Sequence, residues 1–187
     1  KIGIGDVVIG KTVLYHDAQL DMICQNPPYL KEYAGDPALI AAAEKACAEA
    51  GVKALTGKIA TGDLFVGDSE TKAAIEAKCA PDCVEMEGAA VSQIAAKNDV
   101  PCVILRAMSD NADEDGHEVL VVKKFSIAEY VATATRIVAD MVEALWAAGA
   151  AFTETAPVSA DSLPPDPAAS ASGAWSREPH RDNLSGS

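Results

Sequence analysis

A continuous apolar run at residues 100–105, Val-Pro-Cys-Val-Ile-Leu, restricts the fold of this chain most strongly. A strand with one face in water alternates apolar and polar residues, so an unbroken run is typical of a strand covered on both faces. Val7-Val8-Ile9 predicts another strand, and residues 12–15 predict a second extended piece. Because helical segments separate the strands, we expect an α/β protein, a three-layer α/β/α sandwich.

The end signals of a helix are clearest at residues 36–51. Asp36 can act as N-cap, Pro37 suits the first helical position, and Gly51 follows the last turn. The other expected elements are a loop at 21–35, a strand at 52–65 that ends in a glycine-containing turn, helices at 69–78 and 85–97, and a long helix from about 126 to 145 that opens with the capping box Ser126-Ile127-Ala128-Glu129.

Charge and cysteine content exclude several classes of function. The formal net charge of −13 opposes a phosphate backbone, so we expect no nucleic-acid partner. The sequence has no apolar stretch of about 18 residues and no signal-peptide pattern, so we expect no membrane partner and a soluble, cytoplasmic protein. The five cysteines are expected to be reduced core residues, with no metal site and no cofactor.

The composition changes near residue 148. The last part contains Pro164-Pro165-Asp166-Pro167 and a run of alanine and serine, with few large apolar residues. Such a segment cannot bury enough surface to offset the entropy of ordering it. We therefore expect one folded domain over residues 1–148 and a disordered, low-complexity tail over residues 149–187.

A first acidic cluster lies at residues 84–90, Val-Glu-Met-Glu-Gly-Ala-Ala. If the helix begins at Glu85, this carboxylate can simply stabilise the positive end of the helix dipole. Glu87 lies two residues further along, beside small residues that permit a close neighbour. A buried carboxylate at that place needs a polar partner. Glu87 is therefore the stronger candidate for a functional role.

A second cluster, at residues 106–113, follows the apolar run directly. In open α/β sheets, ligands bind beyond the carboxyl ends of the strands, so Arg106, Ser109 and Asp110 are candidate catalytic residues. The alternative is a hydrophilic turn, which an Asp-Asn pair also favours. A third candidate is the turn at residues 61–68, where Phe65 can stack on a heterocycle or can simply fill the edge of the core.

These clusters, in this order, resemble the nucleoside phosphorylase superfamily, and within it the methylthioadenosine/S-adenosylhomocysteine nucleosidases. The motifs that carry the resemblance are Gly5-Asp6-Val7-Val8-Ile9, Tyr15-His16-Asp17-Ala18, Gly62-Asp63-Leu64-Phe65, Val84-Glu85-Met86-Glu87 and Arg106-Ala107-Met108-Ser109-Asp110. Family members have a preceding region with the first strands and the glutamate that activates water, and nothing here matches it. On its own, this polypeptide is therefore expected to be inactive and poorly folded.

The resemblance assigns a role to each motif. Asp110 would protonate the purine at N7, Ser109 would hold Asp110, Phe65 would stack on the base, and the backbone of Val66 would read the base's edge. On the sugar side, Glu87 would accept hydrogen bonds from the ribose hydroxyls and Met86 would lie along the sugar, with Glu85 counted among the substrate-binding residues. Arg106 would lie near the attacking water. The cleavage builds positive charge on the sugar and negative charge on the base, which a carboxylate and a proton donor would stabilise.

The resemblance also implies a homodimer whose neighbouring subunit completes the pocket for the 5'-substituent. Leu20, Ile23 and Pro28, in the loop after Tyr15-His16-Asp17, are the candidate lining residues. The leading hypothesis is hydrolysis of the N-glycosidic bond of 5'-methylthioadenosine or S-adenosylhomocysteine, which releases adenine. Two alternatives stay open: a purine nucleoside phosphorylase, which would use phosphate in place of water, and a non-catalytic remnant that binds purine nucleosides.

Overall fold

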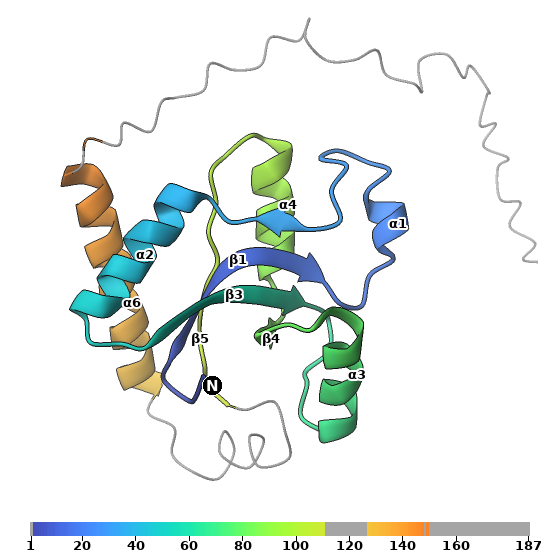
Figure 1. Cartoon of the computed structure of the whole chain (residues 1–187), viewed down its shortest axis with the longest axis horizontal. Coiled ribbons are helices and arrows are strands. Elements are labelled where there is room, and N and C mark those ends of the chain that lie inside the picture. The colour runs from blue at the N-terminus through green and yellow to red at the C-terminus, as the bar shows by residue number, and fades with distance from the viewer. Residues whose placement is uncertain (1, 111–126, 148, 150–187) are drawn as a thin grey trace, which may run out of the picture. The chain divides into compact units, whose positions relative to one another are not determined.

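The computed structural model describes residues 2–110, 127–147 and 149. Its sheet is mixed, with the strands in the order β2-β1-β3-β4 (Figure 1). The central strand β1 (Val7–Tyr15) pairs in parallel with β3 (Ala54–Thr61), and β3 pairs in parallel with β4 (Cys83–Glu85). On its other edge β1 pairs in antiparallel fashion with β2 (Tyr33–Ala34) and β5 (Leu105–Ala107).

Helices cover both faces of this sheet, which confirms the predicted α/β class and its layers (Figure 1). The helices are α1 (Leu20–Ile23), α2 (Pro37–Glu49), α3 (Ser69–Cys79), α4 (Gly88–Lys97) and α6 (Ile127–Ala147). One core cluster joins Val7 and Ile9 of β1 to α2 and α6, and a second joins Val8 to Ile59 and to Ala89 of α4. In the described part of the chain, no helix has the length and apolar character needed to cross a membrane.

A bulge in β1 decides which side chains face which layer. The pairing register with β3 shifts between Gly10 and Thr12. Side chains alternate along a strand, so without the shift Val8 and Val13 would face opposite sides of the sheet, whereas both belong to the core cluster under α4. The two extended pieces predicted at residues 7–9 and 12–15 are therefore one strand with an irregularity between them.

The prediction for residues 100–105 was wrong in its bounds and its burial. The strand begins only at Leu105, and its residues are half-buried. Pro101 has no N–H to donate to a ladder, and the carbonyl oxygens of Cys102 and Ile104 accept isolated bonds from Asp36 N (2.8 Å) and Gly10 N (2.7 Å). The apolar run thus contacts the sheet through single hydrogen bonds and joins the strand pairing only at Leu105.

Other boundaries differ less. The helix expected at 85–97 begins at Gly88, since Glu85 ends strand β4, and the loop expected at 21–35 contains α1 and β2. The helix after Asp36 is confirmed: the Asp36 carboxylate accepts from the backbone of Ala38 (2.9 Å) and Leu39 (3.0 Å). The capping serine at 126 and, apart from Gly149, the tail from 149 onward lie outside the described residues.

Candidate active site

A cavity of about 530 Å³ is lined by residues of α3, β4 and the segment 106–110. Leu55 at the amino end of β3 and Phe65 beyond its carboxyl end both line it, together with one side of α3. The predicted site residues on its wall are Phe65, Val66, Glu85, Met86, Arg106, Ser109 and Asp110. The structure therefore gathers side chains from three separate sequence motifs around one space.

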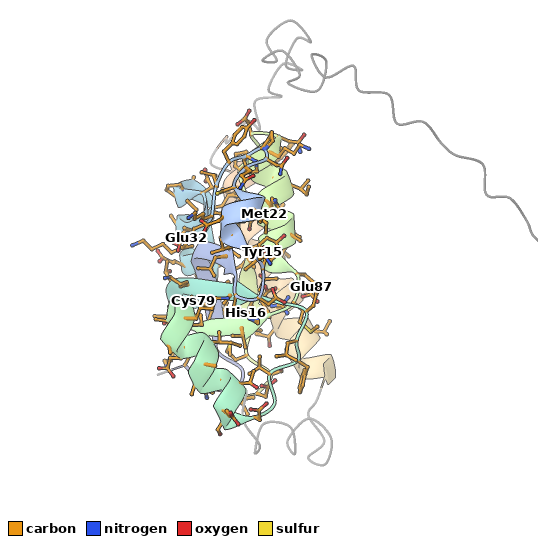
Figure 2. All side chains as sticks on the ribbon, turned by 90° about the vertical axis from the view of Figure 1, so that its right-hand side faces the viewer. Tyr15, His16, Met22, Glu32, Cys79 and Glu87 are labelled. Atoms are coloured by element: carbon orange, nitrogen blue, oxygen red, sulfur yellow. The ribbon has the colours of Figure 1, made fainter. Side chains whose placement is uncertain are left out.

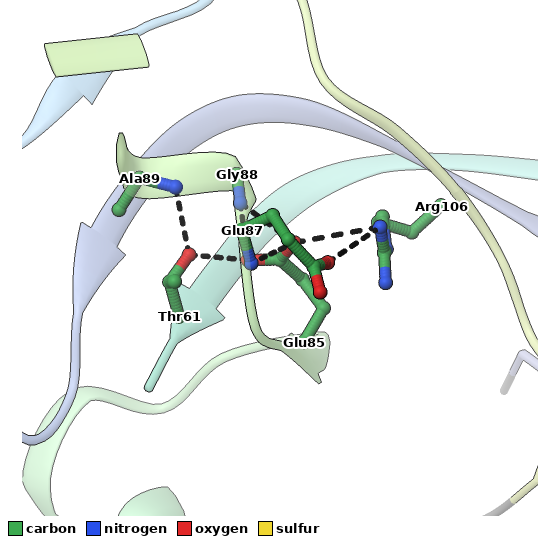
Figure 3. Close-up of polar contacts among 6 residues, drawn as sticks. All are labelled: Thr61, Glu85, Glu87, Gly88, Ala89 and Arg106. Atoms are coloured by element: carbon green, nitrogen blue, oxygen red, sulfur yellow. Dashed lines mark hydrogen bonds and ion pairs between the residues drawn. The ribbon is translucent and has the colours of Figure 1, made fainter. Parts of the chain in front are cut away.

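The carboxylate of Glu85 organises one end of this site (Figure 3). Its side chain is only 2% exposed. It accepts from the backbone N–H groups of Glu87 (3.1 Å) and Gly88 (2.7 and 2.9 Å to its two oxygens), and from the hydroxyl of Thr61. Glu85 thus satisfies donors at the start of α4 that have no partner within the helix. Glu85 was predicted to stabilise the helix dipole from the first turn of the helix. In the structure it is the last residue of β4, and its carboxylate contacts the start of α4 from outside the helix.

Arg106 on β5 joins the two glutamates (Figure 3). Its Nη1 lies 3.6 Å from Glu85 Oε2 and 3.2 Å from Glu87 Oε2. The side chain of Glu87 is 65% exposed and is not part of the cavity wall, so Glu87 reaches the site through Arg106. Glu87 was predicted to need a polar partner if it is buried. It is exposed, so burial does not require a partner, yet its carboxylate forms an ion pair with Arg106.

Asp110 is held by its neighbour and by the backbone before it. Ser109 Oγ donates to Asp110 Oδ2 over 2.7 Å. The backbone of Met108 pairs with the segment that precedes β1: Gly5 N donates to Met108 O (2.8 Å), and Met108 N donates to Asp6 O (2.9 Å). Because β5 is antiparallel to β1, these residues lie at the amino end of β1. Ser109 and Asp110 thus follow the carboxyl end of their own strand, as the sequence predicts, and this end lies next to the amino end of β1.

The turn that carries Phe65 is fixed from the end of β1. Figure 2 looks at the carboxyl ends of β1 and β3 and labels His16 there. A Cβ added to Gly62 would lie 2.2 Å from His16 Nε2, so only glycine fits beside the buried imidazole. Asp17 Oδ2 accepts from Asp63 N over 2.7 Å. The turn is thus held rigidly while the ring of Phe65 remains 53% exposed at the cavity.

Three predicted residues lie elsewhere. Leu20 borders a second cavity, of about 350 Å³, next to Tyr15 and α3. Ile23 and Pro28 line neither cavity. They were predicted to act on a neighbouring subunit, so their position does not bear on that role. Thr61 is the first residue of the turn predicted at residues 61–68, but the sequence assigned it no role; its buried hydroxyl contacts Glu85 and Ala89 N.

Three further side chains, those of His16, Tyr33 and Cys83, are buried in the domain. His16 Nε2 and the hydroxyl of Tyr33 are buried without a hydrogen-bond partner. Burial, together with the nearby charge of Glu85, raises the pKa of the Cys83 thiol to about 12. All five cysteines are free, and within residues 2–110 and 127–147 no group of three or more potential ligands gathers to hold a metal ion.

The fold and this site define the class of protein. A family model described as the Phosphorylase superfamily matches residues 1–143, so the chain belongs to that superfamily. Among curated relatives, the 5'-methylthioadenosine/S-adenosylhomocysteine nucleosidase of Shewanella sediminis is 40% identical over 124 residues, which cover 62% of this chain and 53% of the relative. The nucleosidase of the same name from Geobacillus kaustophilus is 34% identical over 148 residues, 76% of this chain and 60% of the relative.

Solved structures give the same result. The nucleosidase of Neisseria meningitidis in complex with methylthio-immucillin-A superposes with a TM-score of 0.67 at 34% identity, over 77% of this chain and 64% of that one. A futalosine hydrolase mutant of Helicobacter pylori superposes with a TM-score of 0.66 at 28% identity, over 76% and 63%. The chain spans about half the length of the Shewanella relatives that it matches.

Proposed function

We propose that the protein containing this chain hydrolyses the N-glycosidic bond of 5'-methylthioadenosine or S-adenosylhomocysteine and releases adenine. One observation carries the proposal: in a member of the phosphorylase superfamily, Phe65, Met86, Arg106 and Asp110 line a single cavity. Its volume falls within the range of about 300–1,000 Å³ typical of small-molecule sites. The names of the relatives supply the reaction and the substrate class.

On the base side, Asp110 is the general acid. As the bond between C1' and N9 breaks, its electron pair moves into the purine, and a proton from Asp110 to N7 neutralises the leaving group. The bond from Ser109 Oγ restricts how the Asp110 carboxyl group can turn. The exposed ring of Phe65 offers a face on which the purine can stack, and the backbone of Val66 reads the edge of the base.

On the sugar side, positive charge develops on the ribose as the bond breaks. Glu87, held by Arg106 beside the cavity, accepts hydrogen bonds from the ribose hydroxyls, and its negative charge stabilises the positive charge on the sugar. Met86, whose side chain is exposed at the cavity, lies along the sugar. Arg106 orients the water whose oxygen adds to C1', and Glu85 holds Arg106 from its buried side. The added water loses one proton to the solvent, and Asp110 takes up a proton from the solvent before the next cycle.

The charges of the site favour water over phosphate as the acceptor. Phosphorolysis needs cationic groups that are available to an anion. The guanidinium of Arg106 already faces two carboxylates, those of Glu85 and Glu87. Among the described residues of the cavity wall, and apart from the general acid Asp110, the charged side chains are Lys72 and Arg106 against Glu76, Asp82 and Glu85. A phosphate ion would therefore enter a site with an excess of negative charge.

A homodimer is part of the proposal. The loop after β1 exposes large apolar side chains, with Met22 60% and Tyr29 62% accessible. Such residues on a loop that also carries Leu20, Ile23 and Pro28 suit a contact with a second subunit. Light scattering on the purified protein measures its mass directly, and a monomer at micromolar concentration would contradict this part of the proposal.

The test is adenine release from 5'-methylthioadenosine and S-adenosylhomocysteine, measured with and without phosphate. Release in the absence of phosphate is expected, whereas a strict phosphate requirement would replace the nucleosidase with a phosphorylase. Asp110→Asn should reduce kcat by at least about 100-fold while it spares ligand binding, because general acid catalysis contributes that much. Unchanged turnover in this variant would remove Asp110 from its role, and binding without any turnover in the wild type would favour the non-catalytic alternative.

A further inference from the structure

Thr61 lies at the end of β3, where the turn that carries Phe65 begins, and no role in the site has been assigned to it so far. It is buried, and its partner across the parallel pair with β4 is Glu85. A threonine at the end of a strand can serve only to fill space. The contacts of its hydroxyl group indicate a more specific role.

The hydroxyl of Thr61 connects two parts of the site (Figure 3). Its Oγ1 donates to Glu85 Oε1 and accepts from Ala89 N over 2.8 Å. Glu85 in turn accepts from the N–H groups of Glu87 and Gly88. Three successive backbone donors at the start of α4 are thus satisfied by Thr61 and Glu85 together.

Because Thr61 and Glu85 accept these hydrogen bonds, the side chain of the N-cap residue of α4 is not needed as their acceptor. Glu87 occupies the N-cap position, yet its side chain makes no capping hydrogen bond. The usual N-cap residues Asp, Asn, Ser and Thr accept from the first turn of their own helix. Because that demand is already met, the Glu87 carboxylate extends toward Arg106, 3.2 Å from Nη1.

We propose that Thr61 is a positioning residue that keeps the Glu87 carboxylate and Arg106 together in the site. The hydroxyl fixes Glu85 Oε1, so that the other oxygen of Glu85 remains 3.6 Å from Arg106 Nη1, further than Glu87 Oε2. Without the hydroxyl, Glu85 turns toward the guanidinium and competes with Glu87 for it, while Ala89 N loses its acceptor. In assigning Glu87 to the ribose, the inference rests on the proposed function.

Three variants separate a positioning hydroxyl from a residue that only fills space. Thr61→Val keeps the shape of the side chain and removes the hydroxyl, and Thr61→Ser keeps the hydroxyl. Thr56→Val is the matched control, because Thr56 lies on the same strand and its hydroxyl also donates to a glutamate, Glu44, away from the cavity. All three are compared with the wild type in the same two measurements.

The first measurement is the KM for 5'-methylthioadenosine. Thr61→Val should raise it about 10-fold, the effect of one lost hydrogen bond to a charged group, while Thr61→Ser stays within about 2-fold of the wild type. Thr56→Val should leave KM unchanged. Equal KM values for Thr61→Val and Thr56→Val would overturn the inference, and so would a Thr61→Ser variant as impaired as Thr61→Val.

The second measurement does not depend on turnover. Hydrogen exchange followed by NMR should show faster exchange at the amides of Gly88 and Ala89 in Thr61→Val, with protection restored in Thr61→Ser. If the wild type neither binds nor cleaves a nucleoside, the proposed function fails and this measurement decides the role of Thr61 by itself. Unchanged protection in Thr61→Val would then refute the role, and loss that serine restores would support it.

Discussion

Two glutamates two residues apart differ sharply in their surroundings, and the same substitution at each should have very different effects on stability. The side chain of Glu85 is 2% exposed and that of Glu87 is 65% exposed. Both contact the same guanidinium, on Arg106. Glu85→Gln and Glu87→Gln each remove one negative charge and retain the size of the side chain, so burial and hydrogen bonding are the variables that separate them.

The cost of Glu85→Gln follows from its hydrogen bonds. Both oxygens of Glu85 accept from backbone donors. An amide keeps one acceptor oxygen, while its NH₂ group must face N–H groups that have no other partner within the helix. Hydrogen bonds to charged groups contribute about 1.5–3 kcal/mol each, and breaking a buried ionic network costs about 3–5 kcal/mol. We therefore expect a loss of about 3 kcal/mol in the free energy of unfolding, and under about 1 kcal/mol for Glu87→Gln, as for an exposed ion pair.

Urea denaturation followed by circular dichroism measures both variants under the same conditions. With a slope of about 1.5 kcal/mol/M for a domain of this size, the midpoint should fall by about 2 M for Glu85→Gln and by less than about 0.7 M for Glu87→Gln. The comparison requires a single cooperative transition in each case. Equal midpoint shifts for the two variants would refute the reasoning, since burial would then make no difference.

Two more predictions concern the surroundings of the site. Gly62→Ala should destabilise the protein by about 2 kcal/mol, because the added methyl group would overlap the buried imidazole of His16. Gly3→Ala should cost less than about 0.5 kcal/mol, since the nearest atom to its new Cβ is 3.9 Å away. Similar melting temperatures for the two variants would contradict this prediction. The pKa of about 12 at Cys83 implies a thiolate fraction on the order of 10⁻⁴ at pH 8, so iodoacetamide should modify this thiol only after unfolding; equal labelling in native protein and in urea, read by mass spectrometry, would show that the thiol is accessible.

Local signals predicted those elements that local physics decides. Asp36 caps α2, and Gly51, with φ of 68°, follows its end as expected. The helix over residues 69–78 is observed as α3, one residue longer. Hydrogen bonds within one turn determine such features, so neighbouring residues are enough to recognise them.

Non-local pairing explains the errors. The apolar run at residues 100–105 is the strongest strand signal in the sequence, yet only Leu105 of that run pairs with β1. Glu85 reads as the first residue of a helix, whereas its pairing with Thr61 makes it the last residue of a strand. Neither outcome can be recognised without the partner strand, because the apolar pattern alone does not identify which backbone groups will face it.

The sequence by itself determined the α/β class, the start and end of α2 and the set of polar motifs that resemble the phosphorylase superfamily. Tertiary structure decided how these motifs meet: β5 runs antiparallel to β1 and carries Asp110 to the cavity, and Thr61 with Glu85 frees Glu87 to face Arg106. The physical reason is that capping and periodicity act between residues a few positions apart, whereas a site depends on hydrogen bonds and ion pairs between strands that are distant in sequence.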